Sequence, residues 1–127
     1  MQVSSVNSER TARPLSGYSH AVEVSGAARL LFIGGQIPVD INGNVPESFE
    51  DQARLAWQNV IAQLEAAGMG LENVVKHTTF LSDRRYTMQN RKVRSEVFGD
   101  LNPALTLIIT GIFDESWLLE IEAVAAA

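Results

Sequence analysis

The sequence predicts an α+β domain, in which two helices pack on one face of a mixed β-sheet. Three observations support this fold class. Strand and helix patterns follow one another in the order strand, strand, helix, strand, helix, strand, strand. Two segments carry apolar residues at helical spacing, and the last strand alternates between apolar and acidic residues. Because the strands are largely apolar on both sides, the face away from the helices also needs a cover, and self-association is the simplest one.

The composition is that of one domain with a full core. The chain has 127 residues, of which 46% are apolar. Its net charge of -5 and pI of about 4.9 argue against a surface that attracts a phosphate backbone. The absence of cysteine excludes a disulfide framework, a thiol nucleophile and a thiolate metal site, and it fits a cytoplasmic protein. No apolar run approaches the ~18 residues of a membrane span, so no membrane partner is expected.

Residues 1–16 are predicted to be an extended or frayed arm, and residues 17–127 a single domain. The arm has no apolar h-region, so it is not a secretory signal. Its arginines and serines are weakly similar to those of a transit peptide, but Glu9 and the lack of an amphipathic pattern argue against one.

Two strands are predicted before the first helix. In residues 17–24, the two-residue period places Tyr18 and His20 on one face. Residues 29–35 form a short apolar run, which predicts a buried strand that pairs with the first strand as a hairpin. The run ends in two glycines, and at Gly35 the missing side chain allows another backbone or a ligand to come close.

A helix of about five turns is predicted between Ser48 and the glycines at 68 and 70. Ser48 at the N-cap with Asp51 three residues later fits a capping pattern. One apolar stripe recurs at helical spacing: Ala53, Trp57, Val60, Ile61 and Leu64. This stripe is expected to lie on the sheet, with Trp57 in the core.

A strand at residues 74–81 and a second helix at residues 84–98 follow. The strand is rich in β-branched residues, and its histidine, His77, is expected to serve packing. Asp83 can cap the second helix, and Gly99 ends it. With only two histidines and no carboxylate at ligand spacing, no metal site is predicted.

Five cations cluster on the second helix: Arg84, Arg85, Arg91, Lys92 and Arg94. They could form an RNA-binding face, or simply a solvated helix face, which is the usual role of such clusters. The acidic total and the lack of interleaved aromatic residues favour the solvated face, so nucleic acid is not an expected partner.

The last stretch carries the most unusual pattern. Two apolar runs are separated by Asp-Glu-Ser, which predicts a terminal hairpin. The second run alternates, so Glu120 and Glu122 share one face of an otherwise apolar strand. If that face is buried, each carboxylate needs a partner or a proton; if it is solvated, they are ordinary acids. Their spacing of roughly 7 Å also permits a glycosidase-like acid pair, although nothing else supports sugar chemistry.

The order and spacing of several short pieces resemble the Rid family, also called the YjgF family, from Gly17 almost to the C-terminus. The pieces that carry this resemblance are Gly17-Tyr18-Ser19-His20-Ala21-Val22, Gly34-Gly35-Gln36-Ile37-Pro38, Gln52-Ala53-Arg54, Leu64-Glu65-Ala66-Ala67-Gly68, Asn73-Val74-Val75-Lys76 with Phe80-Leu81-Ser82-Asp83, Pro103-Ala104 and Glu120-Ile121-Glu122-Ala123. The resemblance implies a chorismate-mutase-like α+β fold. It also implies a homotrimer with a central barrel and ligand sites in the clefts between subunits.

Deaminating members of that family hydrolyse reactive enamines or imines to a keto acid and ammonia, without a metal or organic cofactor. By position, Glu120 matches their glutamate near the reacting nitrogen, Tyr18 their cleft tyrosine and Gly35 their cleft glycine. Their arginine, which grips the substrate carboxylate, is replaced by Leu105 in the motif Pro103-Ala104-Leu105-Thr106. Leucine cannot donate hydrogen bonds or offset a negative charge.

Two features of the sequence could compensate for that loss or adapt to it, although His20 could also be an ordinary surface or interface histidine. His20 lies two residues from Tyr18 and could replace the lost anchor. Leu105 and Leu107 could make the cleft apolar, which suits an uncharged or aromatic ligand, or they could close a dry interface that holds no ligand.

The sequence leaves three functions open. The first is a Rid-type hydrolase of a small atypical imine, in which Glu120 is catalytic. The second is a trimer that binds a metabolite or chaperones a protein without turnover. The third, an endoribonuclease, is disfavoured by the acidic charge balance.

Overall fold

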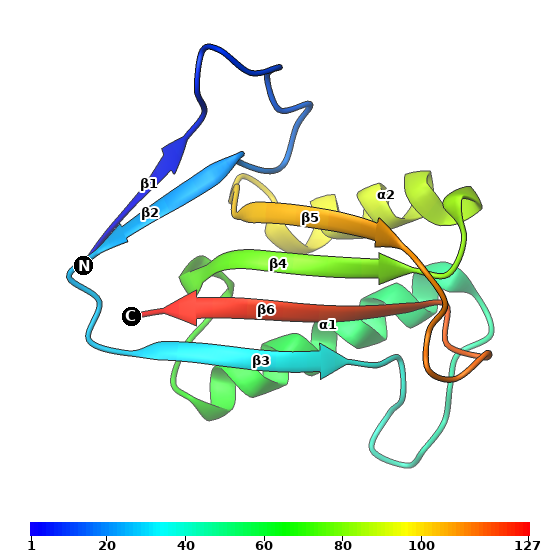
Figure 1. The fold of residues 1–127 in the computed structure, drawn as a ribbon. Helices are drawn as coiled ribbons and strands as arrows, with labels where there is room; N and C mark the ends of the chain where they lie inside the picture. The colour runs from blue at the N-terminus through cyan, green and yellow to red at the C-terminus, as the bar shows by residue number, and fades with distance from the viewer.

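The structure, a computed structural model, describes all 127 residues. Four of its strands form a mixed sheet and the other two form a separate ribbon (Figure 1). The elements in chain order are β1 (Gln2–Val6), β2 (Ala21–Ser25), β3 (Leu30–Gln36), α1 (Phe49–Ala66), a 3-10 turn (Leu71–Asn73), β4 (Val74–Leu81), a second 3-10 turn (Arg84–Tyr86), α2 (Thr87–Phe98), β5 (Ala104–Ile109) and β6 (Leu119–Ala126).

The C-terminal strand β6 lies inside the four-stranded sheet, whose order is β3-β6-β4-β5. It pairs antiparallel with β3 on one side and with β4 on the other, whereas β4 and β5 run parallel. The sheet is therefore mixed, as the sequence predicts. Because β6 has a neighbour on each side, its two faces are the only surfaces that it can offer to a ligand or to a second chain.

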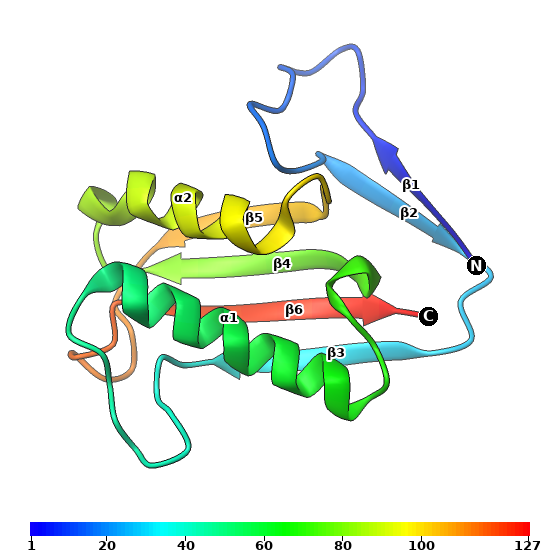
Figure 2. The same cartoon turned by 180° about the vertical axis from the view of Figure 1, so that it is seen from behind.

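Both helices cover the same face of this sheet (Figure 2). The Ser48 hydroxyl accepts a hydrogen bond from the Asp51 amide at 3.2 Å, so the predicted N-cap of α1 is confirmed. The apolar stripe of α1 lies on the sheet, where Trp57 is only 1% exposed. The Trp57 ring packs edge-on against both His77 and Phe98, with centroids 5.0 and 4.9 Å apart. His77 is thus a packing residue, as expected.

The second helix begins one 3-10 turn later than its sequence pattern indicates. The Asp83 carboxylate accepts a hydrogen bond from the Arg85 amide at 2.9 Å and caps this turn. The α-helix proper starts at Thr87 and ends where Gly99 adopts a φ of 55°.

Both predicted hairpins are wrong. β5 and β6 do not pair, because β4 lies between them, and β3 pairs with β6 instead of β2. The turn signals mark correctly where the chain reverses. The identity of the partner strand is set by packing over long sequence separations, which turn residues do not encode.

The N-terminal arm contains a strand that the sequence pattern did not predict. β1 pairs antiparallel with β2, in a register that joins Gln2 to Ser25 and Val6 to Ala21. All five residues of β1 are exposed, so no burial pattern marks the strand. Just before β2, Ser19 forms a bridge with Ala104, and its hydroxyl donates a hydrogen bond to the Asn102 carbonyl oxygen at 2.6 Å, which connects this ribbon to the start of β5.

The sheet face that turns away from the helices is partly apolar and uncovered within one chain. Phe32 is 74% exposed and Leu30 is 59% exposed on β3, and Ile108 is 39% exposed on β5. This is the face for which the sequence predicts a cover. No helix of the structure is long and apolar enough to cross a membrane.

We expect Trp57→Ala to lower the free energy of unfolding by about 3–5 kcal/mol, because it removes a fully buried ring from between α1 and β4. Urea denaturation at one fixed protein concentration measures this loss. Ile41→Ala is the matched control: Ile41 is fully exposed, so its truncation should change stability by less than about 0.5 kcal/mol. An equal loss in both variants would contradict the assigned core.

Candidate functional site

The two carboxylates of β6 point away from the helices. The alternate residues Leu119 and Ile121 are fully buried against the helices, whereas Glu120 is half-buried and Glu122 is exposed. Neither carboxylate forms a hydrogen bond or an ion pair within the chain. Both therefore remain available to a ligand, to water or to a second chain.

Glu120 is positioned directly over Gly35. A Cβ atom added to Gly35 would lie 2.7 Å from Cδ of Glu120, so only glycine leaves room for this carboxylate. Glu120 also lines a hollow of about 260 Å³ with Phe80, Ile112 and Phe113. The structure thus brings together two of the residues that the sequence singles out, beside a hollow that also contains the polar residue Thr110.

Three residues that line this hollow were not predicted from the sequence as site residues. Phe80 lies opposite Glu120 in the β4–β6 register, and Ile112 and Phe113 come from the loop after β5. Phe113 is 94% exposed. A large exposed aromatic residue in a loop was the available signal, although only the strand pairing shows that it lies beside Glu120.

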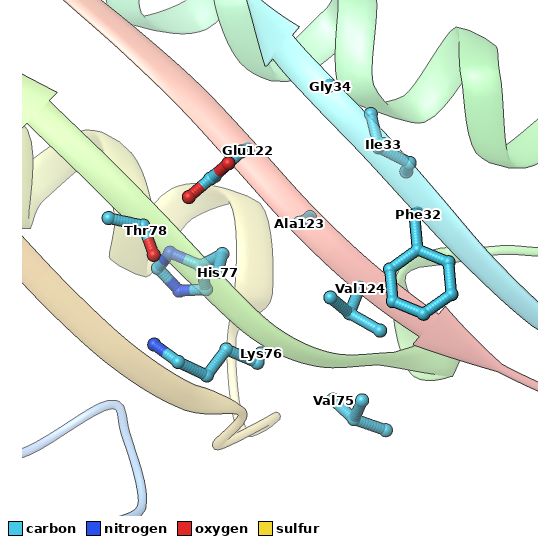
Figure 3. A pocket seen from close by; sticks show the side chains of 10 residues that line it. All are labelled: Phe32, Ile33, Gly34, Val75, Lys76, His77, Thr78, Glu122, Ala123 and Val124. Carbon is cyan, nitrogen blue, oxygen red and sulfur yellow. The ribbon is translucent and has the colours of Figure 1, made fainter.

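Glu122 lines a different hollow, of about 500 Å³, on the same sheet face (Figure 3). Its neighbours there include Phe32, Lys76, Thr78 and Val124, and the Lys76 ammonium donates a hydrogen bond to the Thr106 hydroxyl at 2.9 Å. Glu120 and Glu122 therefore line separate hollows within one chain.

Tyr18 and His20 lie at the other end of the molecule, where the chain passes the start of β5. Their rings meet edge to face with centroids 6.1 Å apart. The Tyr18 hydroxyl accepts a hydrogen bond from the Leu15 amide at 3.4 Å, and the His20 Nε2 contacts the Ala12 carbonyl oxygen. Within one chain, the polar groups of both residues thus face the N-terminal arm.

Leu105 and Leu107 lie on the helix-covered side of the sheet. In the parallel β4–β5 register, they pair with His77 and Thr79, both of which are buried on that side. Glu120 points to the opposite face. The predicted site residues therefore fall into two groups. Gly35 and Glu120 share one face of the sheet, whereas Leu105 and Leu107 point to the other face and Tyr18 and His20 lie near the start of β5.

A cluster of buried polar groups lies beneath α2 near the second group. Five buried side-chain atoms lack a hydrogen-bond partner: Trp57 Nε1, His77 Nδ1, His77 Nε2, Asn90 Oδ1 and Arg94 Nε. Burial, with smaller contributions from the charges of Arg94 and Lys76, lowers the pKa of His77 to about 3. Burial is also the main cause that lowers the pKa of Arg94.

The prediction of a solvated cation face is wrong for Arg94. This side chain is only 6% exposed, whereas Arg84, Arg85 and Lys92 are on the surface. Its Nη2 donates a hydrogen bond to the Ser16 carbonyl oxygen at 3.4 Å. The sequence shows a charged helix but not the N-terminal segment that covers one of its cations.

The fold and the site define a class of protein, that of small α+β chains with candidate ligand residues on both faces of one mixed sheet. Residues 9–127 match the family model described as Endoribonuclease L-PSP. The chain belongs to this family, which is the Rid family, so the family and the fold predicted from the sequence are confirmed.

Individual relatives agree with this assignment. The chain is 36% identical over 119 residues to a RutC family protein of Pyrococcus horikoshii, covering 92% of each. It is 28% identical over 124 residues, 94% of each chain, to Escherichia coli TdcF, whose name assigns it provisionally as a reactive intermediate deaminase. The crystal structure of that protein with bound serine superposes with a TM-score of 0.74 over 98% of both chains at 28% identity.

We expect acid to destabilise the protein through His77. The unfolded chain has a His77 pKa near 6.5 and the folded chain one near 3. The unfolded state therefore binds more protons between these values, so stability is lost as pH falls through this window, by up to about 1.4 kcal/mol per pH unit.

Urea denaturation of wild type and His77→Phe between pH 6.5 and 4.5 measures this contribution. The variant keeps a ring stacked on Phe98 but cannot titrate. Its stability should fall less steeply with acid than that of the wild type, whatever its absolute value. Parallel pH profiles would show that His77 takes up its proton without unfolding.

Proposed function

We propose that this protein is a Rid-type hydrolase of a small enamine or imine, with Glu120 as the catalytic residue. The observation that carries the proposal is the placement of an unpaired carboxylate over Gly35, in a hollow lined by Phe80, Ile112 and Phe113. A carboxylate with no partner in its own chain is free to hold a water molecule against a bound substrate.

The proposed reaction needs no group beyond the substrate and water. Glu120 accepts a proton from water as the water oxygen forms a bond to the carbon of the C=N group. The C=N electron pair moves to nitrogen, which takes up a proton. The carbinolamine then breaks its C–N bond as its hydroxyl proton passes through Glu120 to the nitrogen, and a carbonyl compound and ammonia leave. Phe80, Ile112 and Phe113 exclude bulk water from one side of the reacting group.

A complete site would require two copies of the chain. Glu120 and Leu105 point to opposite faces of the sheet, and Tyr18 and His20 lie by the start of β5, at the end of the sheet far from Glu120, so one chain cannot place them around one small molecule. The uncovered apolar face that carries Phe32 supports self-association. We propose that the chain forms the homotrimer implied by the family, with the ligand in the clefts between subunits.

The relatives support this assignment. TdcF carries a provisional name as a reactive intermediate deaminase, and its crystal structure holds serine, an amino acid of the size of the proposed substrate. Leu105 favours a second candidate, a trimer that binds a metabolite without turnover, because it removes a guanidinium from the predicted cleft.

Release of ammonia and keto acid from freshly generated imines decides between the two functions. We expect wild type to accelerate hydrolysis and Glu120→Gln to lower the rate roughly a hundred-fold or more, because the amide cannot accept the proton of water. The variant should keep its fold, since Glu120 has no partner to lose. An inactive wild type would leave metabolite binding as the function. A fully active Glu120→Gln would instead keep the hydrolase and reject Glu120 as its catalytic residue.

The glycine beneath the carboxylate provides a second test. In Gly35→Ala, the added methyl group must push Glu120 aside, so the hydrolysis rate should fall roughly ten-fold or more. Gly34→Ala is the control, because a Cβ atom added to Gly34 would have no other atom of its own chain within 4 Å. Equal rates in the two variants would mean that the position of Glu120 is unimportant.

A further inference from the structure

Arg94 is a buried guanidinium without a counter-ion. It is 6% exposed, its Nε has no partner, and its one hydrogen bond is the 3.4 Å contact of Nη2 with the Ser16 carbonyl oxygen. The ion pairs of the chain involve only Arg54 and Lys92 as cations. A buried cation with one long hydrogen bond is costly, and burial of this kind normally comes with a carboxylate or phosphate.

The surroundings of Arg94 do not supply that charge. His77 is neutral at physiological pH, and Arg91 is a second cation close enough to lower the Arg94 pKa. Asn90, one helical turn earlier, leaves its own side-chain oxygen without a partner. The groups under α2 therefore give Arg94 no negative neighbour.

The guanidinium lies beside the segment that carries Tyr18. A Cβ atom added to Gly17 would lie 3.6 Å from Nη2 and 3.8 Å from Nε of Arg94. Gly17 has a φ of 73°, a conformation in which other residues are strained, so the turn leads the chain past the guanidinium without a side chain in between. Arg94 is thus in place next to one half of the proposed cleft.

This is also the side of the sheet to which Leu105 points. The register places Leu105 with His77 on the helix-covered side, and α2, the helix that carries Arg94, lies on that side (Figure 2). The guanidinium of Arg94 on α2 can therefore bind a ligand in the half of the cleft where β5 contributes only Leu105.

We propose that Arg94 binds the carboxylate of the small molecule that occupies this cleft. The inference rests on the proposed function for the location of the cleft, and it narrows the ligand class to compounds with a carboxylate beside the reacting carbon. A planar guanidinium can grip both oxygens of such a group, which a histidine cannot do.

Pyruvate, a small keto acid, and its neutral analogue pyruvamide are the probes for the test. In wild-type protein labelled with ¹⁵N-arginine, pyruvate should shift one Nε–Hε resonance, and pyruvamide should leave it in place. Arg94→Met removes the charge and keeps a long apolar stem, so the variant should remain folded. It should lack that resonance and bind pyruvate roughly ten- to a hundred-fold more weakly in calorimetry.

Arg84→Met is the matched control, because Arg84 is an exposed cation at the start of the same helical segment. It should bind pyruvate like the wild type. Unchanged pyruvate affinity in Arg94→Met would overturn the proposal. A second result would also overturn it: Arg94→Met keeps its pyruvate affinity but changes its oligomeric state, as measured by light scattering. The counter-ion of Arg94 would then be a carboxylate of another copy of the chain.

The outcome is separable from that of the hydrolase test. If pyruvate shifts the Arg94 resonance and imines are not hydrolysed, Arg94 keeps its role in a binding protein and the hydrolase proposal fails. If imines are hydrolysed at the same rate by wild type and Arg94→Met, with equal pyruvate affinity, the hydrolase proposal stands and the role of Arg94 is rejected.

Discussion

The burial of one side of β6 is the constraint on which the rest of the structure depends. Leu119, Ile121, Ala123 and Ala125 face the helices and are between 0% and 3% exposed. Because side chains alternate along a strand, this burial fixes Glu120 and Glu122 on the other side. A register shift of one residue would place both carboxylates in the core and four apolar side chains outside, at a cost of many kcal/mol. The position of the candidate catalytic group therefore follows from the core and needs no interaction of its own.

Much of this architecture can be predicted from local pattern. The stripe on α1, the cap at Ser48 and the alternation of β6 each depend on residues close together in sequence, and each is found in the structure. The strand pairing is a property of distant segments, so turn signals gave two hairpins that do not exist. The burial of Arg94 has the same origin: its contact with Ser16 spans 78 residues, and nothing in the helical sequence indicates that cover.

The candidate site shows the same division between local and distant information. The motif that contains Leu105 indicates only that an expected guanidinium is missing from the strand. The charge cluster of the second helix predicts that Arg94 is a surface cation. The fold instead buries it next to the segment that carries Tyr18. A search along the sequence for a replacement would look near the lost residue. Packing of α2 over β4 and β5 places the available cation eleven positions earlier in the chain.

The separation of the two groups of site residues has a consequence for assemblies of mixed composition. If each cleft takes its carboxylate from one copy and its cation from the next, every chain contributes to two different clefts. A chain that lacks either the carboxylate or the cation then disables only one of the two clefts to which it contributes. Two inactive variants, one altered at Glu120 and one at Arg94, would regain activity when assembled together, since some clefts combine the intact half of each. In such a protein, the effect of a site mutation on a cleft depends on both chains that form the cleft, and not on one chain alone.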